Sequence, residues 1–181
     1  MHSHIKRIVL LGPMGIGKTT AIRSLCGSLA IECEAPNLDK LSHSKETTTV
    51  GVDFGEIKLD DNDTLQVYGC PGQDRYDFVR EWALSLAFGV VVMVDIHADD
   101  ALEQTAALIK LSQAASNVQA VVVLISRPAS AAQQEMFTVR LSGYPDCAVP
   151  VLTADPRNPA QMLDTLDIIA AMLPSEAESE M

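Results

Sequence analysis

A glycine-rich stretch near the N-terminus constrains the fold of this chain more strongly than any other feature. It matches the pattern G-x-x-x-x-G-K-[S/T] and reads Gly12-Pro13-Met14-Gly15-Ile16-Gly17-Lys18-Thr19. Small residues let backbone N–H groups curl around phosphate oxygens, while the lysine reaches the β- and γ-phosphates and the threonine hydroxyl ligates Mg²⁺. An apolar run precedes the stretch at residues 5–11, and an amphipathic run follows at residues 18–29. The sequence therefore predicts a phosphate-binding loop between a buried strand and a helix.

Apolar runs alternate with amphipathic segments along the rest of the chain. Runs that predict buried strands recur at residues 89–95, 118–125 and 149–152, and segments of helical periodicity at 77–87, 100–116, 130–141 and 158–173. This alternation predicts a three-layer α/β fold, with a mostly parallel sheet and helices on both faces. Residues 50–59 and 64–68 flank an acidic turn, which predicts a β-hairpin and therefore one antiparallel edge strand.

Two segments interrupt the regular pattern. Residues 27–46 are polar and irregular, which predicts a long loop. Within residues 50–59 the alternation of apolar side chains changes phase at Gly55, which predicts a bulge or bend in the strand. We expect a single domain over residues 1–174, followed by a disordered acidic tail at residues 175–181.

Charge and composition exclude several classes of function. The 181-residue chain has a net charge of -11, which disfavours nonspecific binding to nucleic acid or anionic lipid. A nucleotide remains possible, because phosphate binding depends on local N–H groups and one lysine. With no run of 18 apolar residues and no signal-peptide layout, we expect a cytoplasmic protein without a membrane span. The four cysteines lack CxxC spacing and are interpreted as reduced thiols.

Two segments after the phosphate-binding loop resemble the switch elements of small Ras-like GTPases. The first, similar to switch I of Rab proteins, is Thr49-Val50-Gly51-Val52-Asp53-Phe54, and the second, similar to switch II, is Gly72-Gln73-Asp74-Arg75-Tyr76. A closer resemblance is to bacterial GTPases encoded with roadblock-type proteins, including the conservon GTPases of actinobacteria. Those carry Lys-x-Thr-Thr-Thr-Val-x-x-Asp-Phe-Gly and Gly-Thr-Pro-Gly-Gln, and matching runs stand here at residues 45–55 and 69–73. The resemblance implies the P-loop NTPase fold.

The same resemblance implies a switch protein that binds GTP or GDP with Mg²⁺, hydrolyses GTP slowly and signals through residues 47–55 and 70–76. Mg²⁺ would be held by Thr19 and Thr49, the Gly72 N–H would sense the γ-phosphate, and Gln73 would orient the attacking water beside Lys18. The residues expected to contact the nucleotide are Gly12, Met14, Gly15, Ile16, Gly17, Lys18, Thr19, Thr20, Thr49, Gly72, Arg127 and Ala154. The implied partner is a protein effector or activating protein of the roadblock type.

The chain departs from the family pattern at the Mg²⁺ site. Ras-like proteins carry an aspartate three residues before the switch II glycine, and it holds Mg²⁺ through water. Gly69 stands at that position here. Two interpretations of Asp53 follow: it substitutes for the missing carboxylate through water, or it lies on its strand for other reasons.

The guanine-reading element Asn-Lys-x-Asp is also missing. At its place the chain reads Ser126-Arg127-Pro128-Ala129, without the carboxylate that accepts from guanine and rejects adenine. Arg127 either stacks on a purine ring or faces solvent at a strand end. In Thr153-Ala154-Asp155, the Ala154 N–H would contact the base oxygen. The preference between guanine and adenine stays open at this point.

Two other functions compete with the GTPase interpretation. The degenerate residues 126–129 are compatible with a nucleotide-binding scaffold that has little turnover. The apolar run ending in Asp95 resembles a Walker B strand, which would hold Mg²⁺ in a P-loop ATPase or kinase. In the GTPase arrangement we expect that strand to lie one further from the phosphates, with Asp95 in a loop. No arginine finger is identifiable; we expect Arg75 and Arg80 to form surface salt bridges, and a finger supplied only by a partner would leave intrinsic hydrolysis slow.

Overall fold

The computed structural model describes residues 4–27, 30–31, 34–36, 47–49, 51–59, 63–72 and 76–172. Its strands are β1 (His4–Leu11), β2 (Glu34–Pro36), β3 (Thr47–Thr49), β4 (Asp53–Lys58), β5 (Asp63–Gly69), β6 (Gly89–Val94), β7 (Ala120–Ile125) and β8 (Val151–Thr153). Its helices are α1 (Lys18–Cys26), α2 (Asp77–Leu86), α3 (Ala101–Ala114), α4 (Ala131–Ser142) and α5 (Pro159–Ala171). None of these helices is long and apolar enough to cross a membrane.

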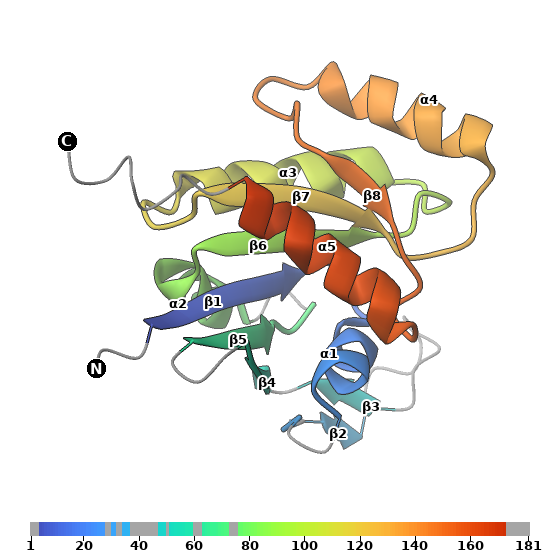
Figure 1. Cartoon of the computed structure of the whole chain (residues 1–181). Helices are drawn as coiled ribbons and strands as arrows, with labels where there is room; N and C mark the ends of the chain where they lie inside the picture. Colours follow the sequence, from blue (N-terminus) through green and yellow to red (C-terminus); the bar gives the residue numbers. More distant parts are fainter. Residues whose placement is uncertain are drawn as a thin grey trace.

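A six-stranded sheet with the order β4-β5-β1-β6-β7-β8 forms the middle layer (Figure 1). The five strands from β5 to β8 run parallel to their neighbours, and β4 pairs antiparallel with β5 at the edge. The prediction of a mostly parallel sheet with one antiparallel edge strand is therefore confirmed. Strands β2 and β3 pair with each other in a separate antiparallel ribbon, which lies near α1 in Figure 1.

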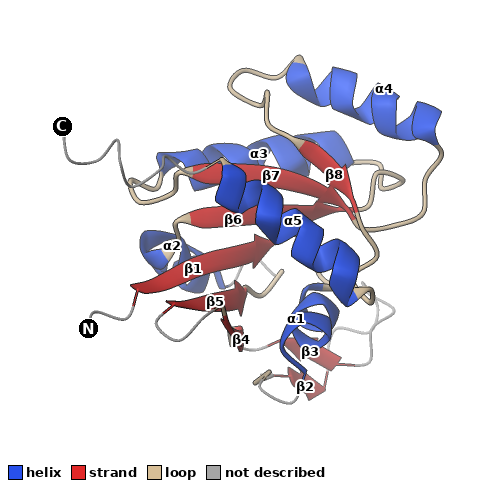
Figure 2. Ribbon diagram, viewed as in Figure 1, coloured by secondary structure: helices blue, strands red, loops and turns tan. Residues whose placement is uncertain are grey.

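Helices cover both faces of the sheet (Figure 2). Successive residues of a strand point to opposite faces, so β1 contributes Ile8 and Leu10 to one core and Val9 and Leu11 to the other. The first core also contains apolar residues of α1 and α5, and the second contains those of α2, α3 and α4. Because β6 and β7 are buried along their whole length, they read as continuous apolar runs in the sequence.

One expectation about the chain between α1 and β5 is wrong, and a second, a bulge or bend at Gly55, is wrong as to the bulge. The polar segment at residues 27–46 was expected to be a loop throughout, but Glu34–Pro36 within it pairs with Thr47–Thr49. The pairing of β4 with β5 runs one residue to one residue through Gly55, so the expected bulge is absent from this strand pair. Gly55 is needed for close packing instead, because a Cβ there would lie 2.4 Å from Cys26 Sγ of α1.

Helix α1 also ends three residues earlier than its apolar periodicity suggests. Gly27 has a φ of +56°, a left-handed conformation that favours glycine, and its N–H donates to the Arg23 carbonyl. This glycine stops the helix at Cys26. The predicted tail at residues 175–181 and the turn at residues 60–62 lie outside the described residues.

Candidate nucleotide-binding site

The glycine-rich stretch forms the turn between β1 and α1, as its sequence pattern predicts. Gly12 and Gly17 have φ values of +143° and +115°, which side-chain-bearing residues rarely adopt. A Cβ on Gly12 would also lie only 2.4 Å from the Met93 carbonyl oxygen of the neighbouring strand β6. The loop can therefore follow this path only with glycine at these positions. It brings the N-terminus of α1, with its positive dipole end, to the carboxyl edge of the sheet.

The Lys18 side chain lies folded back over this loop. Lys18 is 7% exposed, and its Nζ donates to the carbonyl oxygens of Gly12 and Pro13, both at 2.8 Å. These contacts hold the ammonium group at the mouth of the turn, where phosphate oxygens would bind. A lysine kept in this position supplies a positive point charge to a triphosphate.

A buried carboxylate faces the first turn of α1. Thr19 Oγ1 donates to Asp53 Oδ2 at 2.5 Å, and the two residues are 9% and 1% exposed. Asp53 begins β4 and lies directly opposite Gly69 in the β4–β5 pairing. A Cβ at position 69 would lie 3.5 Å from the Asp53 Cβ and 2.9 Å from Ile22 Cδ1. Ile22 of α1 thus occupies the space that a side chain at position 69 would need, and Asp53 reaches Thr19 from the neighbouring strand.

This pair of oxygen ligands fits Mg²⁺ chemically. Mg²⁺ prefers hard oxygen donors and keeps several of its waters, so one hydroxyl and one nearby carboxylate are an appropriate set. The carboxylate is buried and already oriented by the hydroxyl. Of the two interpretations of Asp53, the contact with Thr19 agrees with the first, in which Asp53 compensates for Gly69.

The segment that follows β5 lies against the phosphate-binding loop. A Cβ on Gly72 would be 2.4 Å from the Met14 backbone nitrogen and 2.6 Å from the Pro13 carbonyl carbon. Only glycine permits this approach of two backbones. Cys70 just before it is buried, and burial raises the pKa of its thiol to about 12 even though Lys18 and Arg80 act in the opposite direction. That thiol is therefore protonated and structural at neutral pH.

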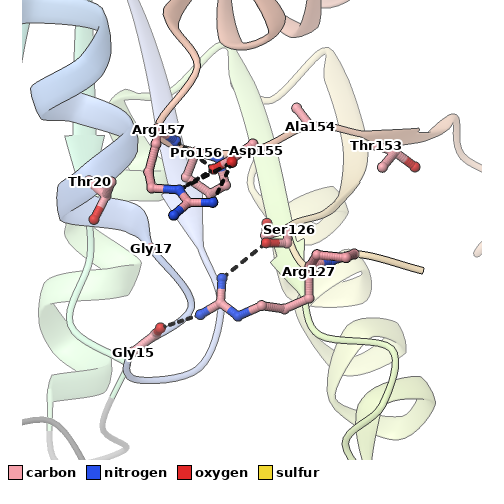
Figure 3. A pocket seen from close by; sticks show the side chains of 11 residues that line it. Gly15, Gly17, Thr20, Ser126, Arg127, Thr153, Ala154, Asp155, Pro156 and Arg157 are labelled. Atoms are coloured by element: carbon pink, nitrogen blue, oxygen red, sulfur yellow. Dashed lines mark hydrogen bonds and ion pairs between the residues drawn. The ribbon is translucent and has the colours of Figure 1, made fainter.

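A cavity of about 510 Å³ opens beside the phosphate-binding loop (Figure 3). It is lined by Gly15, Gly17, Thr20, Ser126, Arg127, Pro128, Thr153, Ala154, Asp155, Pro156 and Arg157. These residues come from α1 and its preceding loop and from the segments after β7 and β8, at the carboxyl ends of parallel strands. This is the usual position of ligand sites in such sheets, and the volume is typical of small-molecule pockets.

Arg127 connects two sides of this cavity. Its guanidinium donates to the carbonyls of Gly15 at 2.7 Å and Ile16 at 2.9 Å, and to its neighbour Ser126 at 3.0 Å. Figure 3 shows the side chain reaching from the end of β7 to the phosphate-binding loop. The sequence left two alternatives for Arg127, stacking or solvent exposure. The structure adds a third role, in which it ties the two loops together.

Asp155 and Arg157 form an ion pair at the rim of the same cavity. The Arg157 guanidinium contacts both carboxylate oxygens, with its closest approach of 2.7 Å between Nη2 and Oδ2. Hydrogen bonds from Arg157 lower the pKa of Asp155 to about 2. The pair was not anticipated from the sequence, although the Asp-x-Arg spacing in a short turn could have suggested it.

A model of the Ras family matches residues 7–140 of this sequence, which is most of the chain. The chain belongs to the Ras family. An uncharacterised protein of Methanocaldococcus jannaschii is 28% identical over 90 residues, which cover 49% of this chain and 50% of that protein. The chain thus spans about half the length of this relative.

The fold of this Ras-family chain also resembles solved structures. A bacterial selenocysteine-specific elongation factor superposes with a TM-score of 0.68 at 13% sequence identity. The match covers 97% of this chain and 30% of the elongation factor. At this identity the likeness concerns the fold, and it agrees with the P-loop NTPase architecture expected from the sequence.

Most of the residues predicted to contact a nucleotide gather around the loop and the cavity. The loop residues and Thr20 do so together with Gly72, Arg127 and Ala154. Ala154 lines the cavity, but its N–H donates to the Ile125 carbonyl at 3.2 Å within the sheet. Thr49 lies in β3, which belongs to the two-stranded ribbon and not to the six-stranded sheet, and its side chain is outside the described atoms. Gln73, Asp74 and Arg75 are outside the described residues as well.

The strand ending at Asp95 differs from its expected position. It was predicted to lie one strand further from the phosphates, but β6 pairs directly with β1 and contacts Gly12. Asp95 itself lies beyond the strand, where its Oδ1 accepts from the His97 N–H at 3.0 Å. Asp95 therefore lies in a loop, as expected. The expected reason, a strand one position further from the phosphates, is wrong, because β6 is the direct neighbour of β1. Arg80 contacts Asp77 on α2 at 3.3 Å, in agreement with the salt bridge expected for it.

Proposed function

We propose that this Ras-family chain is a GTP-binding switch protein that hydrolyses GTP slowly. The carrying observation is the contact of Thr19 with buried Asp53 next to Lys18, since it gathers a hydroxyl, a carboxylate and an ammonium at one loop. A triphosphate needs a cation and oriented N–H groups around its oxygens, and all of these act by position and charge. The family membership supports the same conclusion.

Each residue of the proposed site has a binding or orienting role. Mg²⁺, when bound, would supply positive charge that offsets the charge of the phosphates. Thr19 and Thr49 are the residues proposed to hold it, and Asp53 is the carboxylate proposed to support the metal in place of the residue missing at position 69. Lys18 binds the β- and γ-oxygens, the Gly72 N–H contacts the γ-phosphate, and Gln73 orients the attacking water. Hydrolysis is slow in this proposal because the stabilising arginine comes from a partner.

A protein partner is proposed to bind the segments 47–55 and 70–76 in their triphosphate-ordered form. Helix α2, which directly follows the second segment, supports this with two aromatic side chains on its surface. Phe78 is 69% exposed and Trp82 is 50% exposed, and Trp82 makes an edge contact with Tyr68 of β5. Aromatic residues held by a rigid element are common anchors of protein interfaces. By resemblance, the proposed partner is a roadblock-type protein.

Single-turnover hydrolysis and a binding titration test this proposal. The full chain is mixed with labelled GTP and GDP, with and without Mg²⁺, and the release of phosphate is followed. Tight Mg²⁺-dependent binding with slow hydrolysis is the expected result. If neither GTP nor GDP bound to the chain, the proposed function would be rejected. Tight binding without any hydrolysis, even with an added arginine-bearing activator, would favour a scaffold instead.

A further inference from the structure

The cavity beside Arg127 bears on which base the nucleotide carries. Guanine and adenine differ in the donors and acceptors along their edges. Guanine carries the O6 acceptor and a 2-amino donor, whereas adenine carries a 6-amino donor in place of O6 and has no 2-amino group. A site selects between them only through polar groups that are free to bond with that edge, and such groups can supply a factor of about 10⁴ or more. The partners of each polar group in the lining therefore indicate its selectivity.

The main-chain donors that follow β8 already have partners. Ala154 N–H donates to the Ile125 carbonyl at 3.2 Å, and Asp155 N–H donates to Gln161 Oε1 at 2.8 Å. Neither amide is available to a base oxygen without breaking an existing bond. On the opposite side, the Ser126 hydroxyl is buried and donates to the Leu124 carbonyl at 3.2 Å. These three donors are thus committed to the sheet and its helix.

The acidic residue among the described lining residues is also engaged. Asp155 Oδ1 accepts from the Arg157 backbone N–H at 3.0 Å and from Nε at 2.9 Å, while Oδ2 accepts from Nε at 3.1 Å and from Nη2 at 2.7 Å. Both oxygens are therefore occupied by three N–H groups of Arg157, and the single Nε–H is shared between them. A carboxylate that could recognise the amino and imino groups of guanine is thus held in an ion pair.

The loop that would otherwise bring a reading group to the base is held in place. The Pro128 carbonyl interacts with His97 Nε2 at 2.9 Å, and the Ala129 carbonyl accepts from Gln134 Nε2 at 2.9 Å. Ser130 forms a capping box with Gln133 at the start of α4. These contacts fix the backbone around Ala129, so the side chain at this point of the loop is a methyl group, which cannot bond to a base.

What remains for a base is a planar cation. Arg127 is anchored through Nη1 to the Ile16 and Ser126 carbonyls and through Nη2 to the Gly15 carbonyl, so three of its five N–H groups are engaged and its face, its Nε–H and one Nη2–H remain for a ligand. The N7 atom of either purine can accept from such a donor. Stacking of a base on a guanidinium or another flat group tolerates any base, because every base has a π-face. The hydroxyls of Thr20 and Thr153 in the lining can donate or accept and so suit either purine.

From this arrangement we propose that the base subsite accepts purine nucleoside triphosphates without selecting guanine over adenine. Affinity comes from the phosphate-binding loop, the metal and the Arg127 face, and Asp155 is paired with Arg157 where guanine selection would need a free acceptor. This inference rests on the proposed nucleotide-binding function, and it names the ligand class of that site as GTP, ATP and ITP together.

Competition titrations with the full chain test the proposal. Fluorescent GTP with Mg²⁺ is displaced by GTP, ATP and ITP, the last of which lacks the 2-amino group of guanine. We expect the three affinities to agree within about tenfold, in contrast to a site that reads the base edge. A preference of more than tenfold for GTP over ATP or over ITP would overturn the inference while leaving the proposed function intact. Failure of every triphosphate to bind would reject both.

A substitution at the loop gives a second readout. In Ala129→Asp a free carboxylate is returned to the position where the family pattern has one, so the ratio of GTP to ATP affinity should rise at least about tenfold. Ala129→Asn is the matched control, because its amide also carries a donor that opposes guanine, and the ratio should rise less. An unchanged ratio in folded Ala129→Asp protein would overturn the inference. If that variant does not fold, the ITP comparison on the unmodified chain decides.

Discussion

The two ends of the candidate site contrast in how their polar groups are used. At the phosphate end, Lys18, Thr19 and Asp53 are buried and converge on the space in front of the loop. At the base end, Asp155 and Arg157 are more exposed and bond to each other, and Arg127 bonds to the main chain. Burial of charged groups is costly unless they are paired or bind a ligand. The comparison agrees with the proposals that the phosphate end supplies most of the affinity and that the base end does not select guanine.

The largest effect is expected from removing the ammonium at the phosphate end. Lys18→Ala should weaken GTP binding by roughly 100-fold or more, because loss of one partner from a buried charged contact costs about 2–5 kcal/mol. Isothermal titration in the presence of Mg²⁺ measures the change. Lys6→Ala, on an exposed position of β1, is the control and should leave affinity unchanged. Equal GTP affinities of the two variants would contradict the proposal that Lys18 binds the phosphates.

The next effect concerns the buried carboxylate. Asp53→Asn keeps the shape of the side chain but removes its charge, so about ten times more Mg²⁺ should be needed for full nucleotide affinity. The measurement is a titration of Mg²⁺ at constant GTP, alongside a melting curve to compare stability. Glu56→Gln, further along β4, serves as the control. If Asp53→Asn left the Mg²⁺ requirement unchanged, Asp53 would be a structural residue of the strand and not part of a metal site.

A smaller effect is expected at the base end. Arg127→Ala removes the planar cation and the tie to Gly15 and Ile16, and it should weaken GTP and ATP binding alike by roughly three- to tenfold. Equal losses of GTP and ATP affinity would support the contrast between the two ends, because they indicate a contact that does not distinguish the two bases. A loss confined to GTP would contradict it. Arg140→Ala, exposed on α4, should change neither affinity.

The smallest effect is a predicted insensitivity to pH. The pKa of Asp155 is lowered to about 2 by Arg157, so the carboxylate is charged at every higher pH. Whatever the ion pair contributes is present above the ordinary carboxyl pKa and is lost only as the pH falls through about 2. The ratio of GTP to ATP affinity should therefore be constant between about pH 5 and about pH 8. NMR titration of the carboxyl carbon should show the pKa of Asp155 rising in Arg157→Ala and unchanged in Arg140→Ala.

The sequence predicts the phosphate end well because its signals are local. The loop pattern, the apolar strand before it and the helix after it lie within about twenty consecutive residues. Backbone geometry accounts for the two fixed glycines, and phosphate and metal chemistry for the lysine and the threonine. The parallel sheet follows from long apolar runs for the same reason. The helix end at Cys26 was missed because apolar periodicity continues past Gly27, whose left-handed conformation terminates the helix.

What the sequence leaves open depends on contacts between distant segments. Thr19 and Asp53 are 34 residues apart, and only the pairing of β4 with β5 places the carboxylate opposite Gly69. The link from Arg127 to Gly15 spans 112 residues and depends on the order of the strands. The strand β2 was missed because three residues, Glu34-Ala35-Pro36, are too few to show an alternating pattern, and its pairing with β3 alone defines it.

The close approach of Gly55 to Cys26 has a mechanical consequence. Strand β4 is fastened to α1 at both ends of the helix, through Asp53 at Thr19 and through Gly55 at Cys26, points that are roughly 10 Å apart along the helix axis. Because they are in contact at two points, α1 and β4 are expected to move together as one rigid unit. A displacement of the N-terminal end of α1 is therefore expected to move β4 with it.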